Sequence, residues 1–155
     1  MTTRRKALSS CAKVAGLLVA TGMLPDVALA QVSAINAKAF DTKTMADLMK
    51  ALGASAPIES KEVSVTGPDI AENGAVVPIG AATTLTGVKR LLIMVEKNPA
   101  ILSAMFDVSD AIDSNFTTRV KMGQSSNVYA VALMNDGKAF FAQREVKVTL
   151  GGCGG

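Results

Sequence analysis

The last five residues place one thiol between two pairs of glycines, in the order Gly151-Gly152-Cys153-Gly154-Gly155. Glycine has no Cβ and visits positive φ freely, so this run is expected to form a flexible arm. Extended backbone spans about 3.3–3.6 Å per residue, so the thiol can project roughly 10 Å beyond Leu150. Because its neighbours lack side chains, Cys153 could enter a narrow cleft in another protein.

The Cys153 thiol has little local activation. The chain contains no His, the nearest basic side chain in sequence is Lys147, and the carboxylate of Gly155 lies two residues away. A nearby negative charge disfavours the thiolate, and a free Cys titrates near about 8.5, so only a few per cent is ionised at neutral pH. These residues predict a covalent attachment point on which partner enzymes act, and not a catalyst in its own right.

Two other uses of the tail stay open at this point. An exported binding or structural module could dimerise through a disulfide between two copies of Cys153. A carrier that forms a thiocarboxylate at Gly155 would also end in Gly-Gly, but that chemistry requires ATP-dependent activation in the cytosol. The export signal described next argues against the thiocarboxylate.

Residues 1–30 have the pattern of a secretory signal peptide. Arg4-Arg5-Lys6 precede an apolar run over residues 14–20, and the small residues Ala28 and Ala30 mark a cleavage site before Gln31. The apolar run is too short to span a membrane. The Arg4-Arg5 pair predicts export by the twin-arginine route, which carries folded proteins to the periplasm.

Removing this signal changes the charge and the cysteine count. Of 16 basic and 13 acidic residues, 12 of each remain, so the mature net charge is about zero. No basic surface remains that would predict nucleic-acid binding. Cys11 leaves with the signal, and its position before the apolar run argues against a lipoprotein site. Cys153 is then the only cysteine in an oxidising compartment, which favours a special use for it.

The mature chain, residues 31–155, is long enough for one domain with its own core. A helix is expected from a cap at Asp41 or Thr42 through Leu52, with Gly53 ending it. Its apolar face consists of Met45, Leu48, Met49 and Leu52. We interpret this face as packing against a core or a partner.

From residue 58 onward the pattern changes to short strands separated by turns. Strands are expected near residues 62–66, 75–79, 88–95, 102–108, 116–122, 128–134 and 138–150. Gly67-Pro68, Asn73-Gly74 and the 135–137 hairpin loop separate some of them, Pro78 indicates an edge or bulge, and Arg144 interrupts one apolar face. The fold class predicted is mainly β: an immunoglobulin-like sandwich of about seven strands over residues 31–150, with a short N-terminal helix and the arm at 151–155.

The residue types also exclude several kinds of site. Without His there is no Ser-His-Asp triad, no Cys-His dyad and no His-based metal site. Asp107, Asp110 and Asp113 are interpreted as a solvated acidic turn, because the other ligands of a Ca²⁺ loop are missing. We therefore expect no cofactor, no metal and no independent catalysis.

An exported sandwich that ends in a lone Cys within Gly-Gly-Cys-Gly-Gly resembles the SoxY family. The resemblance covers the whole chain, and the motifs that carry it, besides the signal and the tail, are Asn73-Gly74 to Pro78, Val120-Lys121-Met122-Gly123 and Glu145-Val146-Lys147-Val148-Thr149. It implies that Cys153 carries sulfur intermediates during thiosulfate oxidation.

The resemblance also implies partners. A haem protein, SoxXA, would join thiosulfate oxidatively to Cys153, giving a cysteine S-thiosulfonate, and a hydrolase, SoxB, would release sulfate. A molybdenum enzyme, SoxCD, would oxidise the remaining sulfane where it is present. The chain would pair with SoxZ, a small β-sandwich without its own signal, which would be exported with it. No membrane contact is expected after signal cleavage.

Overall fold

The structure, a computed structural model, describes residues 37–149. They begin with two short helices, α2 (Ala37–Phe40) and α3 (Met45–Ala51). Thr44 caps α3: its Oγ1 accepts the Asp47 N–H at 3.1 Å and donates to the Asp47 carboxylate at 2.7 Å. The expected cap at Asp41 or Thr42 is wrong, because the Thr42 hydroxyl donates to the Ala39 carbonyl and closes α2 instead. Gly53, at φ +68°, follows the helix as predicted.

The larger sheet has the strand order β1-β9-β8-β5-β6. Its long members are antiparallel neighbours: β5 (Val88–Val95), β6 (Leu102–Asp107), β8 (Ser126–Met134) and β9 (Ala139–Val148). Two two-residue strands, β1 (Ile58–Glu59) and β3 (Ile70–Ala71), pair in parallel with the two ends of β9. The strand β5 lies between β8 and β6, which confirms the central strand predicted there.

The smaller sheet has the order β2-β4-β7, all antiparallel, with β2 (Val63–Thr66), β4 (Val77–Thr83) and β7 (Asn115–Val120). Although β4 is central, β2 pairs with it only from Gly80 onward. Pro78 therefore stands where β4 has a neighbour on one side alone, and the missing N–H of proline costs no sheet hydrogen bond there.

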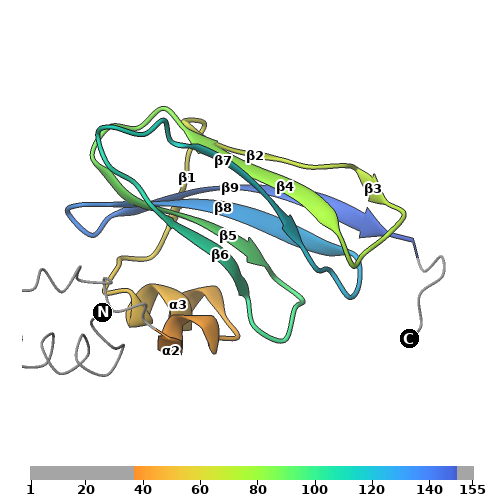
Figure 1. The fold of residues 1–155 in the computed structure, drawn as a ribbon. Coiled ribbons are helices and arrows are strands. Elements are labelled where there is room, and N and C mark those ends of the chain that lie inside the picture. The colour runs from red at the N-terminus through yellow and green to blue at the C-terminus, as the bar shows by residue number, and fades with distance from the viewer. Residues whose placement is uncertain (1–36, 150–155) are drawn as a thin grey trace, which may run out of the picture. The chain divides into compact units, whose positions relative to one another are not determined.

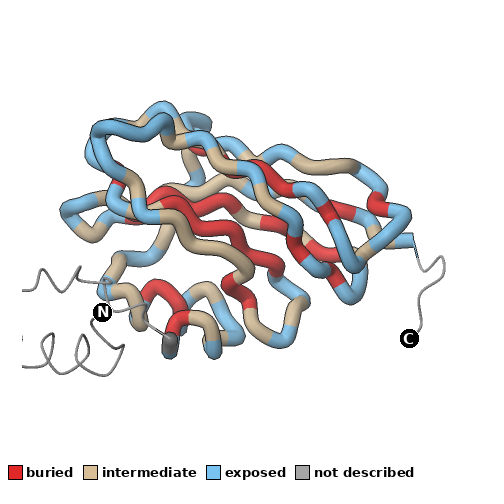
Figure 2. Tube along the Cα trace, viewed as in Figure 1, coloured by how far each residue is buried: buried red, intermediate tan, exposed pale blue. Residues whose placement is uncertain are grey.

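The main core lies between the two sheets (Figures 1 and 2). Side chains alternate along a strand, so Leu91, Ile93 and Val95 of β5 face the smaller sheet. They meet Val77 and Ile79 of β4, and all five are fully buried. This alternation explains why β5 reads as continuously apolar: both of its faces are covered.

A second core lies on the opposite face of the larger sheet, beneath the helices (Figure 1). Leu92 and Met94 of β5 pack there with Leu48 and Met49 of α3. The expected apolar face of this helix thus packs against a core, as interpreted from the sequence. Within the described part of the chain, no helix is long and apolar enough to cross a membrane.

The predicted mainly β sandwich with a short helix is confirmed, and all seven expected strands are present. The 135–137 loop joins β8 to β9, and Gly137 adopts φ +84° in it. The strands β1 and β3 are additional, since two residues show no periodicity from which to predict them. Both add backbone pairing to the strand that leads into the C-terminal segment.

Candidate functional site at the end of strand β9

The predicted attachment residue, Cys153, and its four flanking glycines lie outside the described residues. The same holds for Arg4 and Arg5 and for the cleavage residues Ala28 and Ala30. The structure does describe the base from which the C-terminal segment continues, up to Thr149. The site is therefore built from the end of β9 and the elements around it.

One edge of β9 is held by β3 near its end (Figure 1). The Lys147 N–H donates to the Asp69 carbonyl at 2.9 Å, and the Thr149 N–H donates to the Ala71 carbonyl at 3.1 Å. The Thr149 hydroxyl reaches the same Ala71 carbonyl at 3.4 Å. Pairing therefore extends one residue past the strand itself, to Thr149, the last residue that the structure describes.

The other edge of β9 is held by one side chain. The Ser125 Oγ accepts the Val148 N–H at 2.9 Å and lies 3.5 Å from the Val148 carbonyl, to which it donates. Main-chain pairing with β8 ends at Val146 opposite Ser126. The Ser125 hydroxyl thus takes the place of a sheet partner where β8 has not yet begun.

The turn that carries Ser125 is itself tied to the neighbouring loop. The amide of Asn98 donates to the Lys121 carbonyl at 2.7 Å, and Ser126 Oγ accepts the Lys97 N–H at 3.1 Å. Ser126 is the one buried polar residue within 37–149. Because the turn is fixed on both sides, the Ser125 hydroxyl is held in place to bind Val148.

The β3–β4 turn packs closely on the end of β9 through Gly74. A Cβ at this position would meet the Met122 carbonyl and lie 2.8 Å from Val148 Cγ1. The Gly74 carbonyl accepts the Met122 N–H at 2.7 Å. Glycine is therefore required for this approach, which gives the Asn73-Gly74 turn dipeptide a packing role beside the base of the tail.

Arg144 lies on the core-facing side of β9, where the sequence indicated an interruption. Its Nη2 donates to the Asp69 carboxylate at 2.6 Å, just before β3. The long side chain thus carries its charge to the edge of the sandwich and ties it to the segment that leads into β3. With the arginine side chain 38 % exposed and the aspartate 87 % exposed, this pair contributes about 1 kcal/mol at most.

A partly apolar cavity of about 360 Å³ lies between the start of α3 and the larger sheet, lined by Lys43, Thr44, Met45, Glu96, Ile101 and Tyr129. Burial raises the pKa of the Tyr129 phenol, and the Glu96 carboxylate raises it further. The amide of Asn127 binds the same carboxylate at 3.0 Å. No Cys lines this cavity.

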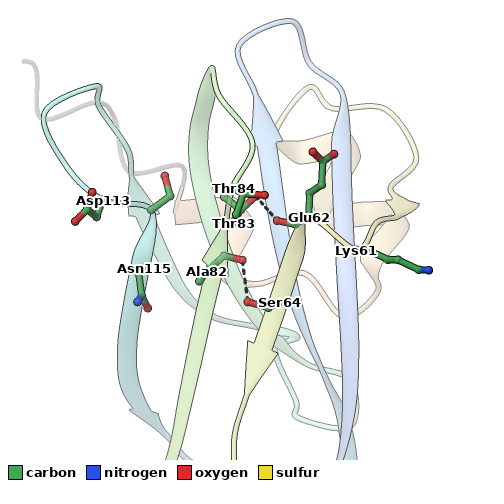
Figure 3. Close-up of a pocket in the computed structure, with 9 residues that line it drawn as sticks. Lys61, Glu62, Ser64, Ala82, Thr83, Thr84, Asp113 and Asn115 are labelled. Atoms are coloured by element: carbon green, nitrogen blue, oxygen red, sulfur yellow. Dashed lines mark hydrogen bonds between the residues drawn. The ribbon is translucent and has the colours of Figure 1, made fainter.

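A more polar hollow of about 530 Å³ lies at the far end of the smaller sheet, with Lys61, Glu62, Ser64, Ala82, Thr83, Thr84, Asp113, Ser114 and Asn115 around it (Figure 3). Its hydroxyls are used internally: Thr83 donates to the Glu62 carbonyl at 2.8 Å, and Ser64 donates to the Ala82 carbonyl. The hollow lies about 20 Å along β4 from Val77. The chain spans at most about 14 Å from Thr149 to Cys153, which is shorter than this separation.

The acidic residues near this hollow do not form a ligand cluster. Asp107, Asp110 and Asp113 are exposed, as expected for a solvated turn, and Asp107 binds Arg90 of β5 at 2.7 Å. Across residues 37–149, no three His, Cys, Asp or Glu side chains are placed to hold a metal ion together.

Comparison with known proteins decides the family. The model of the family SoxY, described as sulfur oxidation protein SoxY, matches residues 48–153, a range that runs from α3 to Cys153. This chain belongs to the SoxY family. The match includes both the end of β9, which is hydrogen-bonded to β3 and Ser125, and the predicted attachment residue.

Solved structures agree with this assignment. The sulfur carrier protein SoxY from Chlorobium limicola f thiosulfatophilum is 36% identical, with a TM-score of 0.61 over 68% of this chain and 96% of that one. A superoxide reductase (neelaredoxin) variant from Ignicoccus hospitalis has a TM-score of 0.51 over 70% of this chain and 100% of that one, but only 13% identity, so it shows a shared fold alone. No curated protein matches the chain.

The family predicted from the sequence is confirmed, and Cys153 as the attachment residue stays a prediction. The residues that hold the end of β9 were missed. Ser125 lies between the strands expected at residues 116–122 and 128–134, and a serine beside a strand often binds backbone. Its partner Val148 is 23 residues away, and β3 is two residues long. Neither distance nor periodicity in the sequence reveals such contacts.

Proposed function

We propose that this protein carries sulfur-oxidation intermediates covalently on Cys153 and presents them to partner enzymes. Membership in the SoxY family is the observation that carries this proposal, because the family match extends to Cys153. The related Chlorobium protein is itself named a sulfur carrier. The protein is a carrier subunit and not an enzyme, which agrees with the unactivated thiol and the absence of His.

Loading and release can be written with atoms and electrons balanced. Cys153 Sγ forms an S–S bond with the outer sulfur of thiosulfate, the thiol proton leaves, and two electrons pass to a haem protein of the SoxXA kind. Water then attacks the terminal sulfonate group in a SoxB-like hydrolase. The bond between the outer thiosulfate sulfur and the sulfonate sulfur breaks, and the sulfonate leaves with the water oxygen as sulfate. The outer sulfur keeps the bonding electrons and a proton, so a persulfide stays on Cys153 for a SoxCD-like enzyme where one is present.

The proposal is supported by a fixed end of β9 that is followed by only a short length of chain before Cys153. Both edges of β9 are bonded up to Val148 and Thr149. Cys153 is the fourth residue after Thr149, so the chain can carry its Cα at most about 14 Å from Thr149 to reach an active site. Because the end of β9 is fixed, the Cys153 thiol can reach only an active site within this distance. This limit favours transfer to an enzyme that is already docked.

We further propose a periplasmic location reached through the twin-arginine signal at Arg4 and Arg5, followed by cleavage after Ala30. A SoxZ-like subunit would form the heterodimer and leave the cytoplasm attached to this chain. This route accounts for a charged signal on a chain whose mature part carries a net charge of about zero.

Replacing the attachment residue tests the proposal. Cys153→Ser should abolish thiosulfate-dependent respiration, because serine cannot form the S–S bond, while circular dichroism and co-purification with the partner subunit stay unchanged. Cys11→Ser is the matched control, since that cysteine lies in the predicted signal and should be dispensable. Respiration that persists in Cys153→Ser, or is lost in Cys11→Ser as well, argues against the carrier.

A further inference from the structure

The length of the tail limits where a partner enzyme can bind. Cys153 is the fourth residue after Thr149, the last residue described, so the two Cα atoms lie at most about 14 Å apart. An enzyme that takes Cys153 into an active site below its own surface must therefore bring that surface to the end of β9. Whatever side chains surround this end become part of the contact.

Two exposed apolar side chains lie on the segment that packs against this end. Ile70 of β3 is 57% exposed, and Val76, just before β4, is 48% exposed. Their neighbours Ala71 and Val77 are buried, so the alternation of a strand turns Ile70 and Val76 away from the core. Only four large apolar side chains within residues 37–149 are this exposed, and two of them are here.

This segment is fixed to β9 and to the turn before β8. The Asp69 and Ala71 carbonyls accept the Lys147 and Thr149 N–H groups, and the Gly74 carbonyl accepts the Met122 N–H. Ile70 and Val76 are therefore presented from a rigid support beside the base of the tail (Figure 1). Rigid apolar side chains lose little conformational freedom on binding, which suits them to a docking contact.

We propose that Ile70 and Val76 form a docking face for the enzymes that load and unload Cys153. The occupant is an enzyme whose active-site opening admits the glycine-flanked thiol and whose rim around that opening is apolar. The face would hold the enzyme while the tail reaches into it. This inference rests on the proposed carrier function and adds to it the surface that the enzymes recognise.

The other two exposed apolar residues provide matched controls. Ile58 stands on β1, a two-residue parallel strand like β3, on the same edge of β9, and it is 61% exposed. It pairs with Phe140, whereas Ile70 pairs with Lys147, so the two isoleucines lie about 23 Å apart along β9. Ile112 lies in the β6–β7 connection, beyond the end of the smaller sheet that is far from Val76.

The test measures enzymatic loading as a function of carrier concentration. The mature protein with its partner subunit is mixed with thiosulfate and periplasmic extract from cells that lack this gene, and mass spectrometry follows the adduct on Cys153. Ile70→Lys and Val76→Lys should each lower kcat/KM for the carrier about tenfold, mainly through KM, as expected for a charge placed in an apolar contact. Ile58→Lys and Ile112→Lys should leave it unchanged.

Two further readouts, alkylation of Cys153 and retention of the partner subunit, separate the alternatives. Alkylation of Cys153 by iodoacetamide should proceed equally in all variants, since a small reagent requires no docking. An equal fall in kcat/KM for all four lysine variants would overturn the docking face, and so would an unchanged kcat/KM for Ile70→Lys and Val76→Lys. Either result would leave the carrier function standing. Loss of the partner subunit from Ile70→Lys and Val76→Lys would overturn it too, by assigning this face to the heterodimer. If the unmodified protein acquires no adduct, the carrier function itself fails.

Discussion

The Ser125 hydroxyl is the side chain that fixes where β9 ends. It accepts the Val148 N–H at 2.9 Å on the edge where β8 has not yet begun. A hydrogen bond of this kind stabilises the local structure by about 1 kcal/mol. Its loss would raise the equilibrium constant for local opening of the end of β9 by a factor of about five. The effective start of the tail therefore depends on one residue far from it in sequence.

Ser125→Ala should release this end of β9. We expect amide exchange at Val148 to rise about fivefold, while exchange at Val131 in the middle of β8 stays the same, because only the local bond is lost. Ser125→Thr keeps a hydroxyl and should restore protection at Val148. Hydrogen exchange followed by NMR distinguishes these cases. Unchanged protection of Val148 in Ser125→Ala, or a uniform rise in amide exchange across the sheet, would contradict a local role for the Ser125–Val148 hydrogen bond.

Tyr129 reports on the interface between α3 and the larger sheet. It is the only tyrosine and the chain has no tryptophan, so the ultraviolet absorbance of tyrosinate follows this residue alone. Burial and the Glu96 carboxylate raise the pKa of its phenol above the ordinary value of 10.0. The unfolded chain then loses the phenolic proton first, so the stability that depends on it is complete below pH 10.0 and declines as the pH rises further.

A spectroscopic titration tests this environment. The midpoint should lie above 10.0 in the unmodified protein and move down in Glu96→Gln, while staying raised, because burial is the larger cause. Glu62→Gln, on the smaller sheet, should leave the midpoint unchanged. A midpoint at or below 10.0 in the unmodified protein would show that Tyr129 is more solvated than the structure places it.

At the scale of elements, long strands were predictable and short contacts were not. Residues 88–95 read as a buried central strand because both faces of β5 are covered, and this prediction is confirmed. The short strands β1 and β3 were missed, because two residues carry no periodicity and their pairing partners lie in β9, far along the chain. Of the two missed strands, β3 is the one that holds the end of β9 before the C-terminal segment.

For helix α3, the apolar face was predictable from the sequence pattern, but the N-terminal cap was not. The apolar face Met45, Leu48, Met49 and Leu52 was recognised from its spacing. Its cap was not, because Thr42 and Thr44 are both good capping residues by type. The choice depends on which backbone groups each hydroxyl reaches, and Thr42 is already engaged by the Ala39 carbonyl at the end of α2.

At the scale of the whole molecule, the proposed carrier function makes the sandwich a support for a thiol beyond one of its ends. The cavity beneath α3 and the polar hollow at the far end of the smaller sheet have no Cys in their linings. The thiol lies beyond the end of β9, in a family match that includes it. Sequence alone pointed to Cys153, because composition leaves one cysteine outside the predicted signal. The docking face proposed at Ile70 and Val76 could be inferred only from the fold.

The measurement that tests the central claim most directly is the intact mass of the mature protein from cells grown on thiosulfate, before and after reductant. The carrier predicts added masses of sulfur or thiosulfonate that reductant removes and that map to the peptide containing Cys153. A bare thiol, or only a disulfide-linked dimer, in cells that are oxidising thiosulfate would contradict the carrier and favour a module that dimerises through its C-terminal cysteine.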